Sequence, residues 1–128
     1  MYESIFKNLP SSPAWQGSFC EALAEDAVWD RDEFWRLHLE LIKAGHASRA
    51  WDDISRELAG AVARIQSRVL GLIAAHYDPH DVFVIENLHA DELRAYTERF
   101  DHAVLGVFSG EVLSESMYDL RSPLIGLV

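Results

Sequence analysis

The segment His76-Tyr77-Asp78-Pro79-His80-Asp81 carries the densest set of chemically versatile side chains in this sequence. Two imidazoles and two carboxylates follow one another closely, and zinc and other divalent ions bind such groups. His76 and His80 would face the same way only if a helix continued through Pro79, which proline disfavours. The favoured interpretation is therefore a helix end with His76 against the core. A small helical metal-dependent hydrolase or metal-binding protein that uses residues 76–81 is the alternative.

Other catalytic patterns are weaker. Cys20 lies in the apolar run FCEAL without a neighbouring base, which predicts a small buried hydrophobic side chain. No serine lies in a GxSxG turn, and acidic pairs such as Asp91-Glu92 are explained by the starts of helices. The sequence thus predicts no catalytic residue, no cofactor and no metal ion, and we expect that the protein is not an enzyme.

The longest apolar pattern runs from about residue 52 to residue 77 and predicts a helix. Its stripe recurs at spacings of four and three, and a second apolar stripe lies one residue further round, so this helix should be covered on two sides. Asp52 or Asp53 is expected to cap it. Arg64 and Arg68 lie on its narrow polar strip. They could bind an anion or another helix, but the favoured interpretation pairs them with carboxylates inside the protein.

The remaining elements are predicted from their start and stop signals. Ser18 with Glu21 has the spacing of a capping box and begins a short helix. Two further helices begin at cap residues followed by an acid at the third position, and both are flanked by a hydrophobic staple. The first should run from Asp30 to Gly45 and the second from His89 to Ser109-Gly110. We therefore predict a mostly α fold: a single helical domain of residues 1–128, built as a bundle around the central helix at about 52–77, with an N-terminal arm (1–16), at most a minor extended segment (82–85) and a docked apolar tail (111–128).

Composition restricts the class of partner. The chain has 128 residues, one cysteine and a formal net charge of −10. Most of the excess acid follows the central helix, whereas residues 48–77 are nearly neutral. Such a surface repels phosphate backbones and attracts a cationic protein, so direct nucleic-acid binding is disfavoured. No secretory signal or membrane span is predicted, and a cytoplasmic location is expected.

Four stretches together resemble a known group of proteins: IFKNLP near the N-terminus, VWDRDEFWRL, HYDPHDVFVIENL and FDHAVLGVFSGE. They are similar to immunity proteins of bacterial polymorphic toxin systems, and more narrowly to those of contact-dependent growth inhibition. The likeness spans Ile5 to about Glu111. It implies a cytoplasmic antitoxin that binds and neutralises the C-terminal toxin domain of a large exported effector, in many cases a basic nuclease, without a cofactor.

The resemblance transfers no toxin-binding residue, so candidates follow from charge and expected exposure. We expect the interface in the acidic second half of the chain, around the proline turn and in the tail. Tyr118 among acids has the character of an interface anchor. The candidate toxin-binding residues are Asp78, Asp81, Glu86, Glu111, Glu115, Tyr118 and Asp119.

Overall fold

The computed structural model describes residues 1–51 and 53–126, and over these ranges it is all-helical, without a strand. This confirms the predicted helical bundle. The helices are α1 (Glu3–Phe6), α2 (Phe19–Asp26), α3 (Arg31–Ser48), α4 (Arg56–Tyr77) and α5 (Ala90–Ser109), followed by a 3₁₀ turn at Glu115–Met117.

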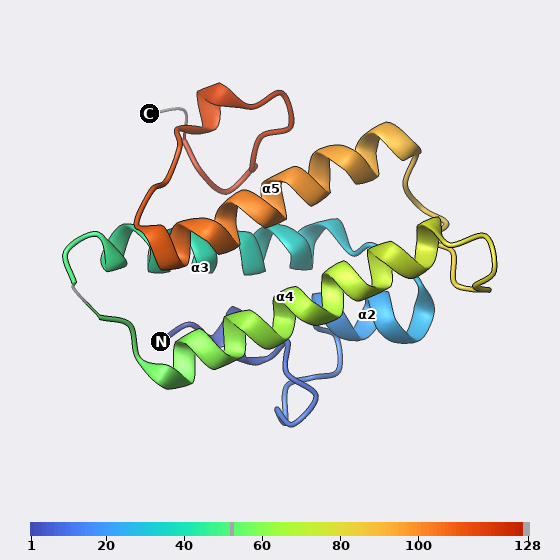
Figure 1. Cartoon of the computed structure of the whole chain (residues 1–128), viewed down its shortest axis with the longest axis horizontal. Coiled ribbons are helices and arrows are strands. Elements are labelled where there is room, and N and C mark those ends of the chain that lie inside the picture. The colour runs from blue at the N-terminus through green and yellow to red at the C-terminus, as the bar shows by residue number, and fades with distance from the viewer. Residues whose placement is uncertain (52, 127–128) are drawn as a thin grey trace.

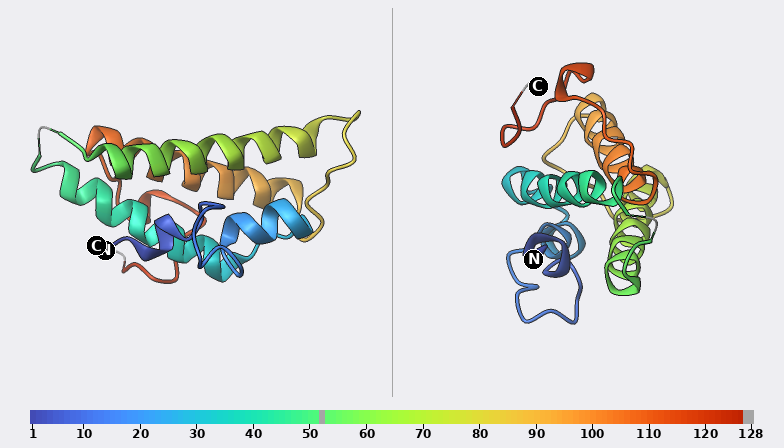
Figure 2. Two further views of the ribbon diagram at one scale, coloured as in Figure 1. Left: turned by 90° about the horizontal axis from the view of Figure 1, so that it is seen from below. Right: turned by 90° about the vertical axis from the view of Figure 1, so that its left-hand side faces the viewer.

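The three long helices run lengthwise through the molecule (Figure 1). α3 and α5 run in the same direction and pack along each other, while α4 runs in the opposite direction and contacts α5, α2 and α1. The end-on view in Figure 2 places α3 in the middle, between the short N-terminal helices and α5. Residues 111–126, which we call the C-terminal strap, return over α3 and α5.

The helices begin at the predicted cap residues, with one exception. The Ser18 hydroxyl and the Asp30 carboxylate accept hydrogen bonds from N–H groups three residues further on, and the N–H of His89 donates to Glu92. α4 is capped instead by Ser55, whose hydroxyl accepts from the Leu58 N–H at 3.1 Å. Asp53 therefore lies before the cap, and Asp52 lies outside the described residues.

Gly45 does not end its helix as predicted; α3 continues to Ser48. The glycine is buried where α3 meets α5, and a Cβ placed on it would lie 2.9 Å from Cγ2 of Val112 and 3.1 Å from the carbonyl oxygen of Gly106. Gly106 is equally tight, with the Glu111 carbonyl oxygen 2.9 Å from a built Cβ. The pair of glycines thus permits a close crossing of the two helices and admits the start of the strap.

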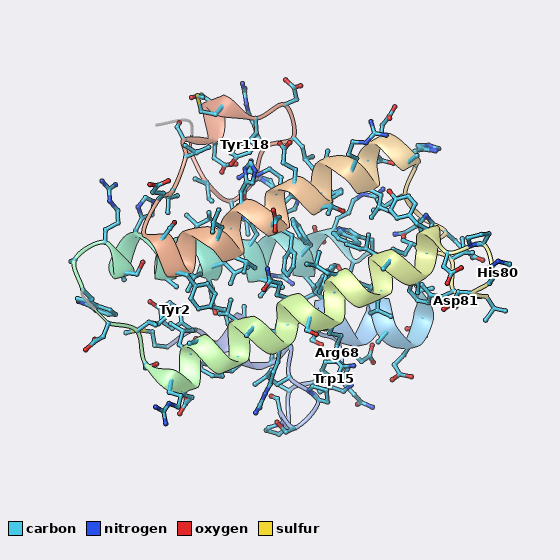
Figure 3. All side chains as sticks on the ribbon, viewed as in Figure 1. Tyr2, Trp15, Arg68, His80, Asp81 and Tyr118 are labelled. Carbon is cyan, nitrogen blue, oxygen red and sulfur yellow. The ribbon has the colours of Figure 1, made fainter. Side chains whose placement is uncertain are left out.

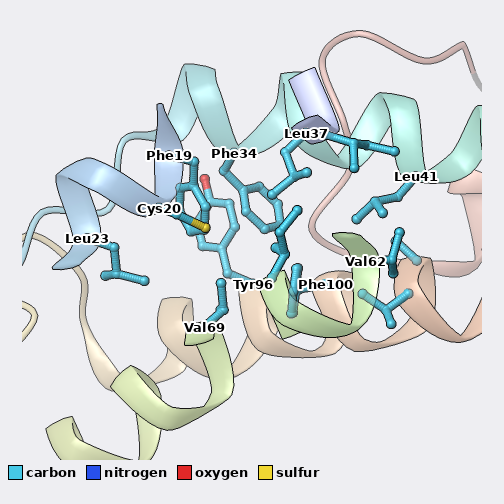
Figure 4. Close-up of a cluster of buried hydrophobic side chains, with 14 of the residues drawn as sticks. Phe19, Cys20, Leu23, Phe34, Leu37, Leu41, Val62, Val69, Tyr96 and Phe100 are labelled. Carbon is cyan, nitrogen blue, oxygen red and sulfur yellow. The ribbon is translucent and has the colours of Figure 1, made fainter. Parts of the chain in front are cut away.

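The core is centred on aromatic side chains from α2, α3 and α5 (Figure 4). Trp29 is fully buried, and its ring centroid lies 4.7 Å from that of Phe19 and 5.3 Å from that of Phe34. The contact with Phe34 is the predicted hydrophobic staple. Cys20 is also fully buried, as predicted, and burial raises the pKa of its thiol to about 12.

α4 is more exposed than its sequence predicts. It buries one stripe, whereas Ala63 and Tyr77 of the second predicted apolar stripe are open to solvent. Among the described residues it is the one helix long and apolar enough to cross a membrane, with a mean hydropathy of 1.3 in its most apolar window, of which 33% is buried. Length and composition alone are weak support for a membrane span, and the buried stripe of α4 packs in the core of the bundle.

Candidate functional site

The segment between α4 and α5 projects beyond the end of the bundle (Figures 1 and 3). Two aspartates shape it: the Asp78 carboxylate accepts from the His80 N–H, and the Asp81 carboxylate accepts from the Phe83 N–H, both at 2.9 Å. At its far end the Ile85 N–H donates to Nδ1 of His76 at 2.9 Å. The segment is therefore held in a defined shape by its own polar groups. We call residues 77–86 the acidic loop.

The acidic loop exposes apolar side chains beside its carboxylates. Val82 is 98% exposed, and Tyr77 and Val84 are about half exposed. The nearby acids Asp78, Asp81 and Glu86 are exposed as well. Exposed apolar side chains rimmed by charge are typical of sites that bind another protein.

Asn87 fixes the base of this loop and was not identified from the sequence. Its side-chain amide accepts from the Trp29 N–H and donates to the Trp29 carbonyl, both at 2.8 Å. The Asn87 carbonyl accepts from Arg31 at 3.0 Å. These bonds tie the loop to the start of α3, which holds the loop at one position relative to the bundle.

The candidate residues of the tail do not join the acidic loop in one surface. The strap lies over α3 and α5, away from the end of the bundle that carries His80 and Asp81 (Figure 3). Glu111 and Asp119 are exposed there. Glu115 and Tyr118 are only 3% and 8% exposed, so they cannot act as surface contacts in this conformation. The prediction that Glu115 and Tyr118 lie on a binding surface is therefore wrong, and the two side chains instead hold the strap to the bundle.

Glu115 and Tyr118 both contact Arg99 of α5. Arg99 is 2% exposed and donates to Glu115 through both terminal nitrogens, with Nη1–Oε1 at 3.0 Å. It also donates to the Leu120 carbonyl at 2.9 Å, and its guanidinium carbon lies 3.7 Å from the ring centroid of Tyr118. The Tyr118 hydroxyl is 2.7 Å from Nδ1 of His102. The buried ion pair thus fastens the middle of the strap.

His38 of α3 completes this cluster. Its Nε2 lies 3.1 Å from Nη2 of Arg99, and because a guanidinium only donates, Nε2 accepts and Nδ1 carries the proton. Burial, assisted by the charge of Arg99, lowers the pKa of His38 to about 3. Burial alone would raise the pKa of Glu115, but hydrogen bonds from Arg99 and from the Ser122 N–H outweigh it and lower that pKa. The cluster therefore holds one positive and one negative charge, with a neutral imidazole beside them.

A cavity of about 150 Å³ lies next to this cluster. Its polar lining residues are His38, Arg99, His102, Ser109, Glu111 and Tyr118, and apolar side chains of α3, α5 and the strap complete it. The charge of Arg99 is already neutralised by Glu115, and His38 is neutral. The buried cluster therefore leaves no unpaired charge of its own, and the exposed Glu111 carboxylate is the remaining charged group of the lining. Holding the strap is the role that its contacts support.

The alternative interpretation of residues 76–81, a metal site, gains no support from the geometry of the described residues. Among the described residues, no three His, Cys, Asp or Glu side chains are grouped so that they could hold a metal ion. Nδ1 of His76 is engaged by the Ile85 N–H, while His80 is exposed in the acidic loop.

Arg64 and Arg68 differ from their favoured interpretation. Both are exposed, and neither forms an ion pair with a carboxylate in the part of the chain that the structure describes. The guanidinium carbon of Arg68 lies 5.7 Å from the ring centroid of Trp15. These two charges are free to meet a ligand.

Comparisons of this chain with protein-family models, with curated proteins and with solved structures found no match.

Proposed function

We propose that this protein is an immunity protein that binds a cognate bacterial toxin domain through the acidic loop and thereby neutralises it in the cytoplasm. The single observation that carries the proposal is the loop itself, which presents Tyr77 and Val82 to solvent on either side of Asp78 and Asp81, on a hydrogen-bonded frame. The resemblance of the sequence to immunity proteins supplies the kind of partner.

The chemistry of the loop favours a cationic partner. Covering an exposed apolar side chain such as Val82 lowers the free energy of the complex, and this short side chain loses little conformational entropy on binding. The acids around it attract a basic surface, and at low ionic strength the net charge of −10 adds to that attraction. A nuclease toxin, whose substrate cleft is cationic, has the matching surface.

The shape of the loop supports a preformed binding element. The loop is anchored by His76 on α4 and by Asn87 against Trp29, so little backbone entropy is lost on binding. We expect inhibition in a one-to-one complex, without a cofactor and without catalysis.

The direct test is co-expression with the C-terminal domain of an exported protein encoded beside this gene. The expected result is restored growth of the producing cell and a co-purifying complex of equal stoichiometry. In the purified pair, Asp78→Asn/Asp81→Asn removes both charges but keeps the side-chain oxygens that accept the loop hydrogen bonds. It should slow association by roughly threefold or more, because steering depends on local charge. Val82→Asp should mainly speed dissociation, because it removes apolar burial at the interface.

Glu98→Gln/Asp101→Asn is the matched control, since it makes the same charge change at exposed positions of α5. It should preserve most of the affinity. A toxin complex whose association and dissociation rates are the same for the loop variants and the wild type would refute the loop as the interface. Absence of growth rescue by the wild-type protein would refute the immunity function itself.

The alternative of a metal-dependent hydrolase gains no support from a specific contact. Its proposed ligands at residues 76–81 are used in loop hydrogen bonds or lie apart on the surface.

A further inference from the structure

A groove of about 580 Å³ lies between α4 and the N-terminal segment that follows α1, on a different surface from the acidic loop. Its α4 side is formed by Arg64, Ser67, Arg68 and Gly71, and its other side by residues 8–11. This volume lies within the range of small-molecule sites, roughly 300–1,000 Å³. The groove is therefore large enough for a ligand of nucleotide size.

Gly71 leaves the groove open. A Cβ built at this position has no atom within 4 Å, so no packing inside the protein requires a glycine here. Glycine in the interior of a helix is destabilising relative to alanine. Leu9 and Leu72 add apolar walls, while Ser67 and Ser11 add hydroxyl groups. The site thus combines an apolar surface with hydrogen-bonding side chains.

The two arginines make this groove positive in an acidic protein. They lie one helical turn apart, so their guanidinium groups can reach one ligand. Neither is neutralised by a described carboxylate, and Arg68 is positioned against the Trp15 ring. At physiological ionic strength charges further than about 8 Å are largely screened. The local arginine pair, not the net charge of the chain, therefore decides which ions are attracted here.

We propose that this groove binds a soluble phosphate-bearing small molecule of about nucleotide size, with its phosphate between Arg64 and Arg68. A guanidinium donates two parallel hydrogen bonds to a phosphate or a carboxylate. A terminal phosphate offers three acceptor oxygens, enough for two guanidinium groups at once, whereas one carboxylate offers two. Ser67 lies between the arginines in the sequence and on the same groove wall, and its hydroxyl adds a donor to the phosphate. The inference does not depend on the proposed immunity function.

Isothermal titration calorimetry of the full chain at physiological ionic strength tests this site with two probes, ADP and inorganic pyrophosphate. Both should bind saturably with one site per chain. Arg64→Gln/Arg68→Gln should weaken binding at least about tenfold, because charge-assisted hydrogen bonds are lost. Arg49→Gln/Arg56→Gln removes the same charge at exposed residues outside the groove, and its affinity should stay within about twofold of the wild type.

A steric variant separates the groove from general electrostatics. Gly71→Leu should fill the groove and weaken both probes, and it should not unfold α4, because its Cβ meets no other atom and leucine favours helices. Gly60→Leu is the matched control: it lies on the same helix, also has no atom within 4 Å of a built Cβ, and lies outside the groove. This variant should bind both probes as the wild type does.

Four results would overturn the assignment. The first is no saturable binding of either phosphate probe, and the second is an equal loss of affinity in the Arg49/Arg56 control. The third is citrate binding as tightly as pyrophosphate, which would make the groove a carboxylate site. The last is binding to vesicles that contain phosphatidic acid without binding to the soluble probes, which would make the source of the phosphate a lipid surface.

Discussion

Acidification from pH 6.5 to pH 5 should lower the free energy of unfolding by about 2 kcal/mol through His38 alone. This imidazole is 1% exposed, and burial together with the charge of Arg99 lowers its pKa from 6.5 to about 3. In the unfolded chain the same side chain takes up a proton near pH 6.5. Between these two values the unfolded state binds more protons, so stability falls as the pH falls.

The magnitude follows from the width of that window. Each pH unit well inside it costs about 1.4 kcal/mol, but at pH 6.5 the unfolded imidazole is only half protonated, so the fall to pH 5 costs about 1.7 kcal/mol, which rounds to 2. The lowered pKa of Glu115 acts in the same direction, because its stabilisation is present above the unfolded value of 4.5 and is lost as the pH falls below it. The interval from pH 6.5 to pH 5 therefore isolates His38 from the carboxylates.

Urea denaturation at pH 6.5 and at pH 5, followed by far-UV circular dichroism, measures this difference. His38→Gln should be less stable than the wild type at pH 6.5, but it should lose less than about 0.5 kcal/mol between the two pH values. His46→Gln, at an exposed position of α3, should retain the wild-type difference. An NMR titration in which the folded-state His38 ring takes up its proton near pH 6.5 would refute the reasoning.

The other predictions concern the buried ion pair and the glycine crossing. Glu115→Ala should reduce the free energy of unfolding by about 3–5 kcal/mol, because it leaves Arg99 buried without its counter-ion. Glu111→Ala, at an exposed position of the same strap, should change it by less than about 0.5 kcal/mol. Equal effects of the two variants in urea denaturation would contradict the proposal that Glu115 holds the strap to the bundle. Gly45→Ala should destabilise the protein by roughly 1–3 kcal/mol, because α3 and α5 must move apart to admit the added methyl group. Gly60→Ala, where a built Cβ meets no atom, should stabilise it by up to about 1 kcal/mol. If the two variants have the same melting temperature, the close crossing of α3 and α5 is contradicted.

Local signals predicted the helices well because they act within a few residues. A cap such as Asp30 needs only the N–H three residues on, and the staple of Trp29 with Phe34 needs only one turn of helix. The same reasoning failed at Gly45. A glycine near an expected helix end usually predicts the C-terminus of the helix. Gly45 instead lies at a contact with Gly106 of α5 that no local sequence pattern predicts.

Candidate site residues divided in the same way. The acids next to Pro79 are exposed because a chain reversal leaves their side chains outside the bundle. In the sequence Glu115 and Tyr118 look equally suited to the surface, yet both are buried in contact with Arg99 of α5. The sequence could not predict the ion pair of Arg99 with Glu115, because these residues belong to two separate elements and meet only when the strap folds back over α5.

The sequence by itself determined the helical class, most of the helix starts and the apolar stripes, since these depend on propensity, periodicity and neighbouring donors. Only the tertiary structure decided which charges are buried and which are free. Arg99 is neutralised inside the bundle, whereas Arg64 and Arg68 face an open groove without a described carboxylate. The physical reason is that burial and pairing of a charge depend on the elements that pack around it, and these come together only when the chain folds.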